Sequence, residues 1–211
     1  MTLQYILFDL DNTLYSARYG LELNVGRRIA DYLAAYLGVS PEEAIRQRQE
    51  RIHCYGTTLE WLMAEKGFTD VEAYYAAIHP AGEADALSPD PGLRRFLEGL
   101  PLPRGILTNS PREHADRILA QLGIPDLFTH IFDIRWSGFT GKPHREVFLR
   151  ALDILGTTPE TTLFIDDTPR CVTGYCALGG KGVLLDEADA YPGYPHPRIR
   201  TLQDIFSLIP V

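Results

Sequence analysis

The chain is poor in cysteine, and the few cysteines it has form no recognisable pattern. Cys54, Cys171 and Cys176 are the only thiols in 211 residues, and no two of them have CxxC spacing. Neither a disulfide framework nor a zinc site is therefore predicted. We expect these thiols to be buried as small apolar groups.

The chain also lacks a basic tract and a long apolar run. Its 28 acidic residues outnumber its 20 lysines and arginines, which gives a formal net charge of -8. Such a surface does not favour nucleic acid or anionic membrane as a partner, because both carry negative charge. No apolar run reaches membrane-spanning length, and the first residues lack the order of a signal peptide. We therefore predict no nucleic-acid partner, no membrane partner and a cytoplasmic location.

What the sequence does contain is an ordinary globular composition, with strands and helices in alternation. Apolar residues make up 45% of the chain, which is enough for a substantial core. Short apolar runs predict five strands, at 5–8, 104–108, 130–134, 162–165 and 182–185. Predicted helices lie between the later strands, at 91–100, 111–123, 143–155 and 168–178, and a last short helix is predicted near 202–208. Strands alternating with helices indicate an α/β fold, in which a parallel sheet carries helices on both faces.

A helical block interrupts this alternation after the first strand. Leucine, valine and isoleucine recur every fourth residue from 21 to 37, which is typical of an amphipathic helix. Further helices are predicted to begin after Ser40, after Thr57 and near Asp70, where capping residues precede apolar positions. We therefore predict two domains, a core of residues 1–17 and 86–211 and an inserted helical domain of residues 18–85.

Polar side chains follow several predicted strands at comparable places. Because the carboxyl ends of neighbouring parallel strands share one edge of a sheet, we expect these side chains to meet there. They supply carboxylates, a hydroxyl, an amide and one ammonium, which is the set that phosphoryl transfer needs. The residues are Asp9, Asp11, Thr108, Asn109, Lys142, Asp166 and Asp167.

Each of these residues has a purely structural alternative when it is taken alone. Asp9 and Asp11 could cap the turn that follows the strand, Thr108 could be an ordinary strand-end hydroxyl, and Lys142 could be a solvated surface lysine. The completeness of the set is what favours the functional interpretation. The histidines share no metal-ligand spacing, so surface or packing roles are expected for residues such as His114.

Four short motifs, in chain order, resemble those of the haloacid dehalogenase superfamily of phosphatases. The motifs are DLDNT at 9–13, LTN at 107–109, GKP at 141–143 and IDD at 165–167. The resemblance implies a Rossmann-like, doubly wound core with an inserted α-helical cap. Within the superfamily the chain is similar to the pyrimidine 5'-nucleotidase branch, through features that include TNS at 108–110 and YGTT at 55–58.

The resemblance also implies a catalytic role for each motif residue. Asp9 would attack phosphorus to form an aspartyl-phosphate, and Asp11 would act first as acid and then as base. Thr108 and the backbone near Asn109 would bond the phosphoryl oxygens, while Lys142 would neutralise the nucleophile and the phosphate.

Mg²⁺ is the cofactor that the resemblance implies. It would bind Asp9, the carbonyl of Asp11 and one acid of the pair that ends the fourth predicted strand. We expect Asp167 to be the direct ligand and Asp166 to act through water.

The implied substrate is a small phosphomonoester, specifically a pyrimidine nucleoside 5'-monophosphate. Tyr55, Gly56 and Thr57 are expected to contact it, although Tyr55 could instead pack in the block while Thr57 only caps a helix. A phosphatase for sugar phosphates, a phosphomutase and a non-catalytic phosphate-binding module are the alternatives. A dehalogenase is disfavoured, because that chemistry does not use an acid at the position of Asp11.

Overall fold

Six parallel strands form one sheet, in the order β3-β2-β1-β4-β5-β6, in the computed structural model, which describes residues 2–209. They are β1 (Tyr5–Phe8), β2 (Arg104–Leu107), β3 (Ile131–Phe132), β4 (Thr162–Asp166), β5 (Lys181–Leu185) and β6 (Arg198–Ile199). The order reverses between β1 and β4, which is where doubly wound sheets bind their ligands. The predicted Rossmann-like α/β fold is confirmed.

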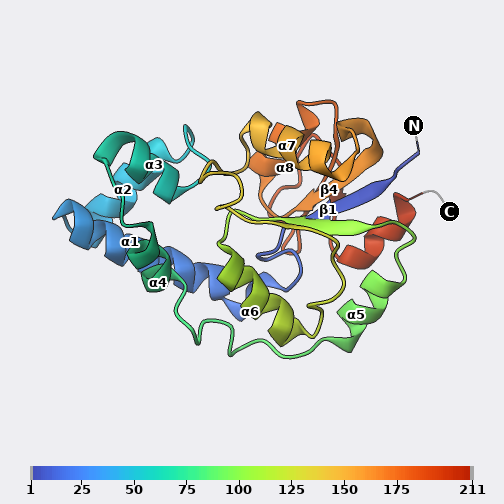
Figure 1. Ribbon diagram of the computed structural model, residues 1–211, viewed down its shortest axis with the longest axis horizontal. Coiled ribbons are helices and arrows are strands. Elements are labelled where there is room, and N and C mark those ends of the chain that lie inside the picture. The colour runs from blue at the N-terminus through green and yellow to red at the C-terminus, as the bar shows by residue number, and fades with distance from the viewer. Residues whose placement is uncertain (1, 210–211) are drawn as a thin grey trace.

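Both faces of the sheet are covered, because successive side chains of a strand point to opposite faces. Ile6 and Phe8 pack in an apolar cluster with α5 (Pro91–Glu98) and α6 (Arg112–Leu122). Tyr5 and Leu7 pack in another cluster with α7 (Arg145–Leu155) and α8 (Pro169–Cys176). Figure 1 shows α7 and α8 on one side of the sheet and α5 and α6 on the other. Burial of each large apolar side chain contributes about 1.5–3 kcal/mol.

The inserted block consists of four helices that surround a separate apolar cluster, which includes Leu33, Trp61 and Tyr74. The helices are α1 (Leu21–Leu37), α2 (Pro41–Arg51), α3 (Thr58–Lys66) and α4 (Val71–Ile78). Their ends follow the predicted capping, since the side chains of Ser40 and Thr57 accept hydrogen bonds from the amides of Glu43 and Glu60. The predicted bounds of the block, 18–85, stay a prediction. The predicted core also includes residues 1, 210 and 211, which lie outside the described range.

Some predicted elements differ from the structure. Strand β3 is two residues long, because the Asp133 carboxylate turns to accept hydrogen bonds from the amides of Arg112 and Trp136. The last helix is a 3-10 helix, Leu202–Ser207, and β6 is too short to produce a periodic pattern. Cys54 is exposed, so the expectation of burial is wrong for that thiol. Among residues 2–209, no helix is both long and apolar enough to cross a membrane.

Candidate active site

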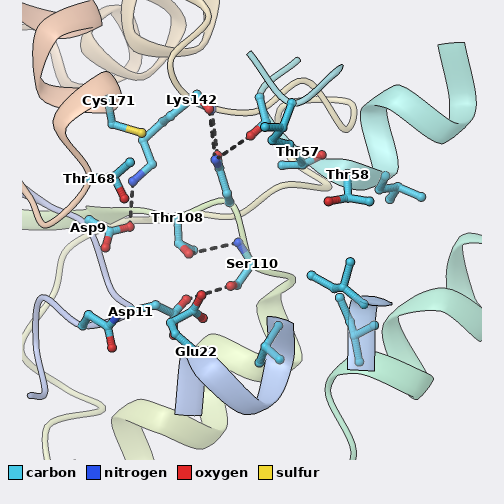
Figure 2. Close-up of a pocket in the computed structure, with 18 of the residues that line it drawn as sticks. Asp9, Asp11, Glu22, Thr57, Thr58, Thr108, Ser110, Lys142, Thr168 and Cys171 are labelled. Carbon is cyan, nitrogen blue, oxygen red and sulfur yellow. Dashed lines mark hydrogen bonds and ion pairs between the residues drawn. The ribbon is translucent and has the colours of Figure 1, made fainter. Parts of the chain in front are cut away.

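A cavity of about 270 Å³ lies between the carboxyl edge of the sheet and the helical block. Figure 2 shows Asp9, Asp11 and Lys142 on one side of it, with Thr57 and Thr58 on the other. The structure brings all seven strand-end and loop residues into the lining: Asp9, Asp11, Thr108, Asn109, Lys142, Asp166 and Asp167. The block contributes further lining residues, among them Glu22, Arg48, Thr57, Thr58 and Tyr74.

Asp9 follows the central strand β1 and is 7% exposed. Its amide donates to the carbonyl of Ile165 on the neighbouring strand β4, which fixes the backbone at the point where the sheet order reverses. One carboxylate oxygen accepts from the Thr13 hydroxyl at 3.0 Å, and the other lies 2.6 Å from the Lys142 ammonium. Asn12, directly after the second acid of the motif, has a φ of 53° and so turns the chain after the strand. The carboxylate is therefore held in place while it faces the cavity.

Lys142 is 1% exposed and bridges two acids, since its ammonium donates to Asp9 and to Asp166, each at 2.6 Å. Burial opposes the charged form, but the carboxylates of Asp166 and Asp9 raise the pKa of Lys142 above its ordinary value. Asn109 fixes the lysine backbone from the other side, because its side chain accepts from the Lys142 amide and donates to the Lys142 carbonyl. A solvated surface lysine is thereby excluded.

The acids at this edge form a donor set that suits a hard divalent cation. Ligand oxygens of Asp9, Asp166 and Asp167 lie within 4.8 Å of one another, and Lys142 supplies one positive charge against the three. Burial and the charge of Asp166 raise the pKa of Asp167 to about 7, which reflects this excess of negative charge. Asp166 already accepts hydrogen bonds at both oxygens, from Lys142 and from the Thr168 amide. The residues fit Mg²⁺.

Asp11 is held by three side chains in the position that the structure records. The Tyr15 hydroxyl and His114 Nε2 each lie 2.7 Å from Oδ1, and the Ser110 hydroxyl donates to Oδ2 at 2.7 Å. Burial opposes the charge of this carboxylate, but His114 and these hydrogen bonds lower the pKa of Asp11. The Ser110 hydroxyl thus binds Asp11 and does not cap α6, whose cap position is occupied by Pro111 without a side-chain hydrogen bond.

The segment 55–57 meets the core at one side of the cavity. The Gly56 carbonyl accepts from Arg170 at 2.6 Å and from the Asn109 amide at 3.5 Å. The Thr57 hydroxyl accepts from the Glu60 amide and so caps α3. Gly56 and Thr57 line the cavity, whereas Tyr55 does not.

The expectation that Tyr55 offers its ring to a substrate is not supported. Its ring packs against the apolar cluster of the helical block, and its hydroxyl donates to Glu65 at 2.9 Å. Tyr55 therefore takes the packing role that the sequence left open as an alternative.

Several residues at the site were missed from the sequence. His114, expected in a surface or packing role, is fully buried and contacts Asp11. Burial opposes its charged form, yet the carboxylate of Asp11 raises the pKa of His114 to about 10. Glu22 and Arg48 line the cavity from the helical block, and Arg170 joins the block to the core. One feature of the sequence could have pointed to His114, because it lies in the first turn of the helix that follows the strand-end motif at 107–109.

Comparison with known proteins places the chain in a family. A sequence model described as hydrolase, haloacid dehalogenase-like hydrolase, matches residues 3–173. The chain is 32% identical over 191 residues to Phosphate metabolism protein 8 of Saccharomyces cerevisiae, a match that covers 84% of this chain but only 60% of the yeast protein. It is 27% identical over 182 residues to Hexitol phosphatase A of Escherichia coli, covering 82% of this chain and 78% of that protein.

Solved structures agree with this placement at the level of the fold. An HAD phosphatase from Thermococcus onnurineus superposes with a TM-score of 0.66 at 22% identity, over 98% of this chain and 97% of that one. L-2-haloacid dehalogenase from Xanthobacter autotrophicus has a TM-score of 0.62 at 20% identity, over 99% and 98% of the two chains. With the sheet order, the four motifs and the match over residues 3–173, the chain belongs to the haloacid dehalogenase-like hydrolase family.

Proposed function

We propose that the protein is a Mg²⁺-dependent phosphatase that hydrolyses small phosphomonoesters through an aspartyl-phosphate at Asp9. The observation that carries the proposal is the 2.6 Å contact of Asp9 with Lys142 in a cavity that also holds a second acid, Asp11. Buried charged groups that face a cavity favour a functional role over a structural one.

The chemistry takes two steps. An Asp9 oxygen attacks phosphorus, the bond from phosphorus to the ester oxygen breaks, and protonated Asp11 gives its proton to that oxygen, so that an alcohol leaves. Asp11 then takes a proton from water, the water oxygen attacks phosphorus, and the bond to Asp9 breaks to release inorganic phosphate. Thr108 and Lys142 donate hydrogen bonds to the phosphoryl oxygens in both steps.

Mg²⁺ held by Asp9, the Asp11 carbonyl and Asp167, with Asp166 acting through water, would neutralise the charge that a phosphoryl group brings beside these acids. Burial raises the pKa of Asp9 well above its ordinary value, and the Lys142 ammonium 2.6 Å away partly offsets this by lowering it. The helical block acts as the cap that encloses the leaving group, because its residues form the wall opposite the acids.

A pyrimidine nucleoside 5'-monophosphate is the substrate we favour. Val25, Ile29 and Ile78 give the block side of the cavity an apolar surface against which a flat ring can pack. Arg48 lines the same side, and its Nε donates to the Thr58 hydroxyl at 2.7 Å. The guanidinium carries further N–H donors, which suit the carbonyl oxygens on a pyrimidine edge.

A sugar phosphate is the second candidate. The likeness to Hexitol phosphatase A supports it, as does the carboxyl group of Glu22, which lines the cavity and suits the hydroxyl groups of a polyol.

Phosphate release from p-nitrophenyl phosphate, UMP, CMP and a hexitol phosphate, each with Mg²⁺, tests these proposals. We expect the highest kcat/KM for the two nucleotides. Arg48→Met should lower kcat/KM for the nucleotides about tenfold or more, because a hydrogen bond to a charged group is lost. It should leave kcat/KM for p-nitrophenyl phosphate unchanged. Arg46→Met is the matched control, since the exposed Arg46 lies on the same helix and pairs with Glu43 and Glu50 of that helix.

No phosphate release from any of the four compounds would overturn the phosphatase proposal. A preference for the hexitol phosphate that is indifferent to Arg48 would overturn only the choice of nucleotide.

A further inference from the structure

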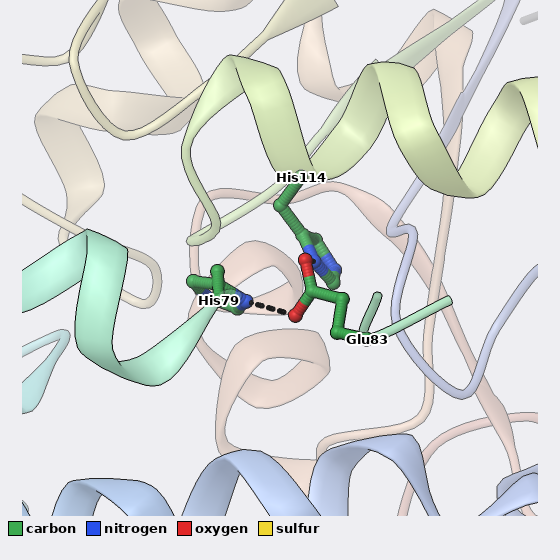
Figure 3. Close-up of side chains that lie close together, drawn as sticks. All are labelled: His79, Glu83 and His114. Atoms are coloured by element: carbon green, nitrogen blue, oxygen red, sulfur yellow. Dashed lines mark hydrogen bonds and ion pairs between the residues drawn. The ribbon is translucent and has the colours of Figure 1, made fainter. Parts of the chain in front are cut away.

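A chain of buried side chains leads from the acid Asp11 to the connection between the helical block and the core. His114 Nε2 lies 2.7 Å from Asp11 Oδ1, and His114 Nδ1 lies 2.6 Å from Glu83 Oε1. The other Glu83 oxygen lies 2.8 Å from His79 Nδ1. Figure 3 shows Glu83 between the two imidazoles. The side chains of His79, Glu83 and His114 are 4%, 2% and 1% exposed, so water does not compete for these contacts.

The members of this chain come from different parts of the fold. Asp11 follows β1 and His114 belongs to α6, so both are fixed by the core. His79 ends α4 of the helical block, and Glu83 lies in the segment that returns from α4 to α5. Arg117 of α6 also donates to Glu83 at 2.6 Å and to the His79 carbonyl at 3.0 Å. The returning segment is thereby tied to the helix that carries His114.

The contacts at His114 leave it one orientation. Each ring nitrogen faces a carboxyl oxygen and donates to it, Nδ1 to Glu83 Oε1 and Nε2 to Asp11 Oδ1. Asp11 Oδ2 is then the oxygen that can carry the proton of the acid. A ring rotation that broke one bond would break the other, and it would remove a donor from two buried carboxylates at once. Glu83 therefore fixes the ring, and the ring fixes one oxygen of Asp11.

Two histidines and a glutamate are also a set that binds transition metals. Here both Nδ1 atoms are directed at glutamate oxygens at hydrogen-bonding distance, and the Arg117 guanidinium occupies the same carboxylate. A cation placed among them would replace these hydrogen bonds and meet the positive charge of Arg117. Hydrogen bonding is the better account of the cluster.

We propose that His114 is a positioning residue that orients Asp11 for proton transfer to the leaving group, and that Glu83 acts through His114. The inference rests on the proposed phosphatase activity. The segment between α4 and α5 then has a function, because it carries Glu83 and so links the helical block to Asp11 through His114.

Phenyl phosphate and p-nitrophenyl phosphate provide the test, because they are similar in size but differ in how much their leaving group needs a proton. For both, kcat/KM reports the steps up to release of the phenol. We expect His114→Gln to lower kcat/KM for phenyl phosphate about 10- to 100-fold, which is part of the rate enhancement that a positioned acid contributes. For p-nitrophenyl phosphate, kcat/KM should stay within about threefold of the wild-type value. His130→Gln, at an exposed histidine before β3, should change neither.

Glu83→Gln keeps the test decisive even if His114→Gln folds poorly. It should shift the ratio of the two kcat/KM values in the same direction, and the double variant should be no worse than His114→Gln, because Glu83 acts through the histidine. Thermal denaturation of each variant reports its folding.

Three results would count against the inference. Equal loss on both esters would mean that His114 only supports the fold. Stoichiometric zinc in the purified protein that disappears in His79→Asn would make the cluster a metal site. Wild-type protein that hydrolyses neither ester would overturn the proposed function, and this inference with it.

Discussion

The helical block and the core approach each other closely at two glycines, Gly56 and Gly141, which makes Gly56→Ala a sharp perturbation. A Cβ at position 56 would lie 2.5 Å from both the carbonyl carbon and the carbonyl oxygen of Gly141, and 2.6 Å from its Cα. These are backbone atoms, so no rotation of a side chain relieves the clash. Gly141 cannot simply retreat, because Lys142 follows it and is bonded through its backbone to Asn109 and through its ammonium to Asp9.

The variant is therefore expected to displace the block from the core. Overpacking of this kind costs about 1–3 kcal/mol. If that cost falls on the contact between block and core, the conformation in which the two are in contact becomes about 5- to 150-fold less populated. The Gly56 carbonyl would also lose alignment with Arg170, which now donates to it at 2.6 Å. We expect kcat/KM to fall by a factor in that range.

The assay compares kcat/KM and the thermal midpoint for three proteins. Gly26→Ala is the matched control, because that glycine lies inside α1 and a Cβ there meets nothing within 4 Å. It should keep wild-type kcat/KM and gain up to about 1 kcal/mol of stability from the better helix propensity of alanine. Gly141→Ala should resemble Gly56→Ala, since its Cβ would lie 2.8 Å from Thr57 Cγ2.

Wild-type kcat/KM in Gly56→Ala would refute the reasoning, because it would mean that the close approach of the two glycines has no part in activity. An equal loss in Gly26→Ala would point to damage within the block rather than at its contact with the core.

Three further predictions follow from the site. Asp9→Asn should abolish phosphate release while circular dichroism stays unchanged, and Asp11→Asn should lower kcat by about 10²- to 10⁴-fold, the usual worth of a general acid; full activity in either would contradict its assigned role. EDTA should silence the enzyme and Mg²⁺ restore it, and titration calorimetry should show weaker Mg²⁺ binding for Asp167→Ala than for Asp166→Ala. Burial and the charge of Asp11 raise the pKa of Glu22 to about 8. The folded protein thus keeps a proton that the unfolded chain loses near pH 4.3, so without metal its stability should fall as pH rises from about 4 to 8. In Glu22→Gln this contribution should be missing from the thermal midpoints measured across that range.

Local features of the fold were readable from the sequence because their causes are local. The four-residue spacing of apolar positions places α1, and the capping side chains of Ser40 and Thr57 bond amides only three residues away. The acids and Lys142 could be grouped in advance for a different reason. Parallel strands bring their carboxyl ends to one edge whatever their order, so strand-end residues meet.

The tertiary structure alone decided which side chains support those residues. His114 and Asp11 are 103 positions apart, and Arg170 and Gly56 are 114 apart, so no periodic pattern relates them. Tyr55 illustrates the same limit, since the sequence allowed its ring either direction and the packing of the block turned it toward Glu65. Sequence patterns report which residues share a face or a turn, whereas contacts between distant elements depend on how the helices pack on the sheet.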